Sequence, residues 1–90
     1  MGFFASLFTA RFRSEKLNSD PIQHEFAKLL IAAAEDGGFF QEMAVKLFID
    51  SHGWTRSEKE LRAAHAAAIV KSNRPDLYKA AKEIAIKQTA

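Results

Sequence analysis

Apolar residues recur along most of this chain at intervals of three and four, the spacing of one face of an α-helix. The clearest case follows Pro21, where the apolar positions form one stripe: Ile22, Phe26, Leu29, Leu30 and Ala33. No segment sustains the strict alternation of apolar and polar residues that is typical of a strand. The sequence therefore predicts an all-α fold, a compact bundle of four to five short helices with tight connections.

Two local patterns mark the starts of helices. Asp20 can accept a hydrogen bond from a free amide of the first turn, Pro21 suits the first helical position, and Gln23 completes a D-x-x-Q capping box. Thr55 and Glu58 form a second capping box, T-x-x-E, in which each side chain bonds the backbone amide of the other residue. Helices are therefore expected to begin directly after Asp20 and after Thr55.

Glycine and proline mark the ends of the same helices. Gly37-Gly38 stops the helix that begins at Pro21, and Gly53 suits the left-handed conformation that closes the next one. Pro75 pushes the residue before it out of helical geometry and opens the last helix. Trp54, between a glycine and a helix cap, is expected at a helix corner and partly buried.

The segment after the double glycine is apolar over much of its circumference. One face is formed by Phe40, Met43, Ala44, Leu47 and Phe48, and Phe39 and Ile49 widen it. The polar residues Gln41, Glu42, Lys46 and Asp50 take the other side. An amphipathic helix turns its apolar face toward the core, so this pattern predicts that the face is packed.

The C-terminal part contains two alanine-rich helices whose small side chains allow close packing. Their apolar faces are predicted to consist of Leu61, Ala64, His65, Ala68 and Ile69 in the first helix, and of Leu77, Tyr78, Ala81, Ile84 and Ala85 in the second. No internal linker is evident, so residues 1–90 are expected to form one domain. Residues 20–88 are its helical core, and residues 1–18 are an amphipathic N-terminal helix that could detach.

Composition supports a packed and soluble protein. Of the 90 residues, 48% are hydrophobic, which is too many for a disordered chain. The sequence has no cysteine, which excludes disulfides and cysteine-ligated metals and fits a reducing compartment. No stretch reaches the roughly 18 apolar residues of a membrane span, and no basic residue precedes the apolar N-terminus as in a secretory signal. We expect a cytoplasmic protein.

The histidines are the first candidates for catalysis or metal binding. His24, His52 and His65 are not spaced as H-x-x-x-H or E-x-x-H pairs, which place two ligands on adjacent helical turns. The simpler interpretation is that His52 stabilises a helix C-terminus and that His65 is a half-buried packing residue. No phosphate-binding loop or nucleophile motif is present, so no enzyme activity, metal or cofactor is expected.

The N-terminus suggests a partner-binding surface because its apolar residues, four of them aromatic, form one stripe: Phe3, Phe4, Leu7, Phe8 and Phe12. This helix either completes the core or docks on another protein, with a homodimer as the simplest case. An anionic membrane surface is a further but less favoured partner, given Arg11, Arg13 and Lys16 at the edge of the stripe.

The alternative is a nucleic-acid-binding regulator built like a helix-turn-helix. Its second helix would span residues 55–72 and present Arg56, Lys59 and Arg62 to DNA. Glu58 and Glu60 at the same end would face the phosphates. The net charge of only +2 also makes the electrostatic contribution to DNA affinity small, so nucleic acid is the less favoured partner.

Overall fold

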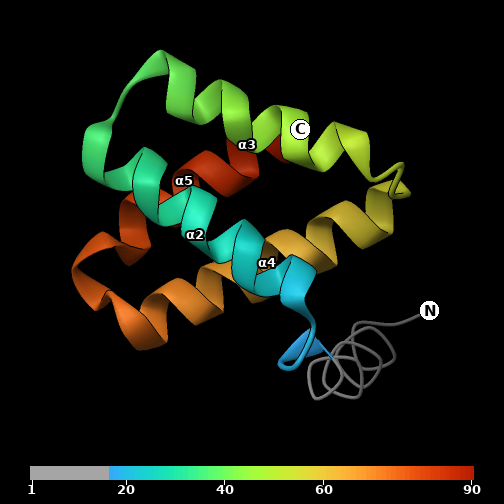
Figure 1. Cartoon of the computed structure of the whole chain (residues 1–90), viewed down its shortest axis with the longest axis horizontal. Coiled ribbons are helices and arrows are strands. Elements are labelled where there is room, and N and C mark those ends of the chain that lie inside the picture. The colour runs from blue at the N-terminus through green and yellow to red at the C-terminus, as the bar shows by residue number, and fades with distance from the viewer. Residues whose placement is uncertain (1–16) are drawn as a thin grey trace.

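The computed structural model describes residues 17–90, and in this range it is all-α. The helices are α2 (Pro21–Asp36), α3 (Phe39–Ser51), α4 (Arg56–Asn73) and α5 (Tyr78–Thr89), with a single 3-10 turn, η1 (Pro75–Leu77), before α5 (Figure 1). No strand occurs in this described range. The predicted helical bundle is confirmed, whereas the predicted N-terminal helix lies largely outside the described residues.

Helix α2 lies in the middle of the bundle, between α3 and α4, and it contacts α5 as well (Figure 1). Helices α4 and α5 pack against each other, and α3 packs against α2 and α5. The core between them consists of Phe26, Ala27, Leu30, Ala33, Val45, Ile49, Ala63, Ala66, Val70, Ala81, Ile84 and Ala85. Six of these twelve residues are alanines, and their small side chains let the helix backbones approach closely.

The helix ends mostly follow the sequence signals. Asp20 Oδ1 accepts a hydrogen bond from the Ile22 amide at 2.9 Å, and both bonds of the Thr55–Glu58 capping box form. Gly37 closes α2 in the left-handed conformation, with φ of 63°, and its amide donates to the Ala33 carbonyl. A residue with a Cβ is strained at such a φ, which is the physical reason for glycine at this position.

The packed side of α3 differs from the prediction. Val45 and Ile49 are fully buried and Phe48 is half-buried, whereas Phe40 and Leu47, assigned to the packed face, are 83% and 63% exposed. Apolar residues surround most of this helix, so their pattern did not determine which side would face the core. Contacts with α2 and α5 select the side that carries Val45 and Ile49.

The packed face of α4 is also rotated from the predicted one. Ala64 and Ala68 are exposed, while the buried positions of α4 are Ala63, His65, Ala66, Ala67 and Val70. A run of alanines gives little contrast between the faces of a helix, so the prediction of its buried side was wrong at these positions. The stripes predicted for α2 and α5 are confirmed at Phe26, Leu30, Ala81 and Ile84, which are buried.

Candidate functional site

The most prominent apolar feature of the described surface lies on the outer side of α3. We call it the α3 surface, and it consists of Phe39, Phe40, Met43 and Leu47. Phe39 is 69% exposed, and its ring meets that of Phe40 edge to face at 5.8 Å. With roughly 200 Å² for each large side chain, these residues leave about 400–500 Å² of apolar area in water. A patch of this size on a small protein is often functional.

The charges bordering the α3 surface are paired. Lys46 Nζ lies 3.2 Å from Asp50 Oδ2 on the same helix. On the side toward α5, Lys87 Nζ lies 3.1 Å from Glu42 Oε1. The surface is therefore apolar with a balanced rim, and it lacks the excess of positive charge that attracts phosphates.

Helix α3 is anchored at its C-terminal end by an aromatic cluster. The Phe48 ring lies 5.3 Å from Phe26 and 4.5 Å from His52, and His52 stacks on Trp54 at 4.6 Å. The His52 side chain also hydrogen-bonds the Phe48 carbonyl at 2.7 Å through Nδ1. His52 thus stabilises the end of the helix and Trp54 is partly buried at the corner, as the sequence predicted.

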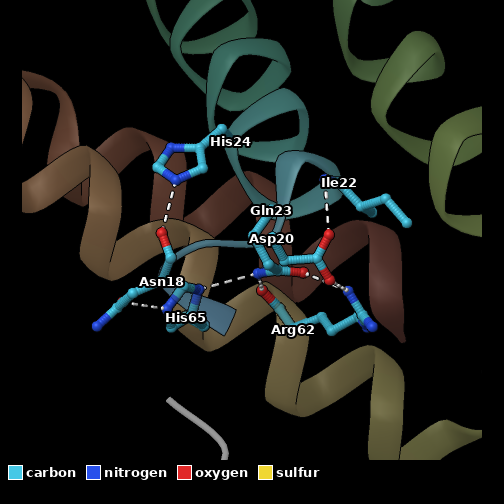
Figure 2. Close-up of polar contacts among 7 residues, drawn as sticks. All are labelled: Asn18, Asp20, Ile22, Gln23, His24, Arg62 and His65. Atoms are coloured by element: carbon cyan, nitrogen blue, oxygen red, sulfur yellow. Dashed lines mark hydrogen bonds and ion pairs between the residues drawn. The ribbon is translucent and has the colours of Figure 1, made fainter. Parts of the chain in front are cut away.

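A second feature, which the sequence did not reveal, is a polar cluster between the start of α2 and α4 (Figure 2). Gln23 is fully buried at its centre. Its Oε1 accepts a hydrogen bond from Arg62 Nη1 at 3.0 Å, and its Nε2 donates to the Arg62 carbonyl at 3.0 Å. Gln23 therefore does not close the capping box predicted with Asp20, because its buried amide finds its partners on α4 instead.

The cluster also fixes the protonation state of His65. A guanidinium can only donate, so Gln23 Oε1 must face Arg62, and Gln23 Nε2 must donate to His65 Nδ1 at 3.0 Å. The proton of the neutral ring is then on Nε2, which donates to Asn18 Oδ1 at 2.7 Å. Burial lowers the pKa of His65, the nearby His24 and Arg62 lower it further, and Asp20 opposes them. His65 is thus a buried, neutral residue that links Asn18 to α4.

We expect acid to destabilise the fold through His65. The folded state binds this proton less readily than the unfolded chain does, so the stabilisation is complete above the unfolded pKa of about 6.5 and falls below it. Urea unfolding at pH 7.5 and pH 5.5, a window above the ordinary carboxylate pKa values, should show lower stability at the acidic pH. The variant His65→Gln, which keeps a donor toward Asn18 but does not titrate, should reduce this pH difference; an unchanged difference would contradict the assignment.

The residues predicted for nucleic-acid binding are not equivalent in the structure. Arg62 binds Asp20 Oδ2 at 3.3 Å as well as Gln23, and its guanidinium lies over the Trp54 ring at 4.8 Å. Arg56 is exposed and lines a groove of about 410 Å³ between α4 and α5, whereas Lys59 is half-buried. Arg62 is therefore committed to intramolecular contacts. The predicted partner-binding residues Phe3, Phe4, Leu7, Phe8 and Phe12 lie outside the described residues.

Residues 17–90 contain no group of three His, Cys, Asp or Glu side chains that could hold a metal ion. None of the helices in this range is long and apolar enough to cross a membrane. No family model matches the chain, and neither the curated proteins nor the solved structures include a match.

Proposed function

We propose that this protein is a non-enzymatic protein–protein interaction module and that the α3 surface is its contact. The observation that supports this function is the exposure of Phe39, Phe40 and Leu47 on one side of a single helix. Burying a large apolar side chain is worth about 1.5–3 kcal/mol, and the contacts among residues 17–90 do not supply this free energy at these positions. A partner that covers the α3 surface would gain this free energy of burial on binding.

The rest of the fold suits this role because it holds α3 in place. Val45 and Ile49 pack its inner side into the core, and Glu42 ties its first turn to Lys87 on α5. A helix that is already ordered loses little conformational entropy when it binds. The exposed residues, at positions 39, 43 and 47 with Phe40 beside them, have the spacing by which helices dock on apolar grooves or on other helices.

The charge distribution favours a protein partner over a nucleic acid or an anionic membrane. The Lys46–Asp50 pair at the edge of the surface contributes no net charge. DNA binding and binding to anionic lipid both depend on clustered lysine and arginine. Apolar side chains with a balanced rim are instead typical of contacts between proteins.

Site-specific photo-cross-linking in the cell of origin tests this function. Phe40 is replaced by a photoreactive benzoylphenylalanine, and the same group at Ile86, which is 60% exposed on α5, serves as the matched control. We expect a covalent protein adduct from position 40 but not from position 86. The adduct should disappear when Leu47→Lys is added to the same chain. Absence of any adduct at position 40 would refute the proposed function.

A further inference from the structure

We infer that the partner of the α3 surface is a second copy of this chain, bound with its α3 antiparallel across a two-fold axis near Met43. This inference rests on the proposed function, because it uses the same surface. It adds the identity of the partner and the register in which the two helices meet.

The register follows from the spacing of the exposed residues. Phe39 and Leu47 each lie four residues from Met43, on opposite sides of it. An antiparallel copy centred on Met43 therefore places Phe39 against the partner's Leu47, and Leu47 against the partner's Phe39. A two-fold contact must be self-complementary in this way, because the same patch supplies both sides of the interface.

The remaining groups on this side of α3 fit the same arrangement. Phe40 comes opposite the partner's Lys46, whose aliphatic stem can cover the ring while its ammonium group stays in water. Antiparallel helices also place the positive end of one helix dipole beside the negative end of the other. A parallel arrangement would instead align the two dipoles and place Phe39 against its own copy.

The size of the α3 surface determines the affinity that we expect for the dimer. Two copies of about 400–500 Å² each bury about 800–1,000 Å² in total, which is the range of weak, transient interfaces. The dimer should therefore be reversible, with a dissociation constant on the order of micromolar or weaker.

Light scattering and sedimentation of the full chain test the self-association. The apparent mass should rise with concentration from 10.1 kDa toward twice that value. Leu47→Lys should raise the midpoint concentration about tenfold or more, because it places a charge in the apolar contact. Ile86→Lys, the same kind of change at an exposed apolar residue of α5, should leave the midpoint unchanged. A monomer at every concentration up to about 1 mM would overturn the inference.

Cysteine cross-linking tests the register, and the absence of native cysteines makes each introduced thiol unique. Under mild oxidation, Met43→Cys should form a disulfide-linked dimer by itself. Phe39→Cys should not, because its own copy lies about 12 Å away along the helix, beyond disulfide reach. An equimolar mixture of Phe39→Cys and Leu47→Cys should form the mixed dimer. Rapid self-linking of Phe39→Cys would overturn the antiparallel register.

The two sets of experiments separate this inference from the proposed function. If the purified chain is monomeric and the photoreactive group at position 40 links to a different protein, the inference is wrong and the proposed function is supported. A monomeric chain without any adduct would end both. An adduct whose mass is that of two copies, together with the cysteine pattern above, supports both.

Discussion

Phe26→Ala is expected to remove about 3–5 kcal/mol of unfolding free energy, the usual cost of truncating a fully buried phenylalanine. Phe26 is 0% exposed, and its ring lies 5.3 Å from Phe48 and 6.0 Å from Trp54. The substitution leaves a cavity where α2 meets the end of α3. Domains of this size have a total stability near the lower end of about 5–15 kcal/mol, so the variant should be largely unfolded or melt far below the wild type.

Phe40→Ala is the matched control, since it makes the same chemical change at an 83% exposed position. It should alter the stability of the monomer by no more than about 0.5 kcal/mol. Urea unfolding followed by the fluorescence of Trp54, the single tryptophan, measures both variants at a concentration where the chain is monomeric. Equal losses in the two variants would show that Phe40 is buried and that the outer side of α3 has been assigned wrongly.

The parts of the fold that sequence predicted well depend on neighbouring residues. The caps at Asp20 and Thr55 and the left-handed Gly37 act within a few residues, so their effects can be recognised in the sequence itself. The helices α2 and α5 have one apolar stripe each, and their buried residues belong to it except for Gln23 and Ala27 of α2. Local capping residues are sufficient to predict where these helices begin and end, and a single apolar stripe is sufficient to predict which side is buried.

The candidate site was not predictable in the same way. Helix α3 has more apolar residues than one packed side can bury, and only its contacts with α2 and α5 decide that Val45 faces inward and Leu47 outward. The number of apolar residues in α3 was the one indication in the sequence of an exposed apolar surface. A helix with apolar residues nearly all round needs packing partners on more than one side. The sequence therefore indicated that α3 has more apolar residues than the core can bury, but not which side of the helix would be exposed.

The polar cluster depends on contacts between distant parts of the chain. Gln23 and His65 are 42 residues apart, and Asn18 and His65 are 47 apart. The D-x-x-Q spacing gave Gln23 a local interpretation that was chemically reasonable but wrong. A buried amide needs partners for both its donor and its acceptor, and only the packing of α2 on α4 supplies them.

Gln23→Ala should cost about 2–4 kcal/mol of unfolding free energy, the second largest effect that we expect, because it removes the three hydrogen bonds of a fully buried side chain. Arg62 Nη1 loses the acceptor Oε1, and His65 Nδ1 loses its donor. Urea unfolding at pH 7.5 measures the loss. The control is Gln41→Ala, which removes an exposed hydrogen bond to Asp36 and should cost no more than about 0.5 kcal/mol.

Gln23→Glu tests the hydrogen-bond pattern alone, because it keeps the side-chain volume that Gln23→Ala removes. A carboxylate of the same size can still accept from Arg62, but it cannot donate to His65 Nδ1. Instead, it favours a proton on that nitrogen, because the protonated ring can donate to the carboxylate. The loss of stability between pH 7.5 and pH 5.5 should therefore shrink or reverse in Gln23→Glu. If this variant keeps the pH dependence of the wild type, Gln23 does not control the protonation of His65, and the cluster is held together in some other way.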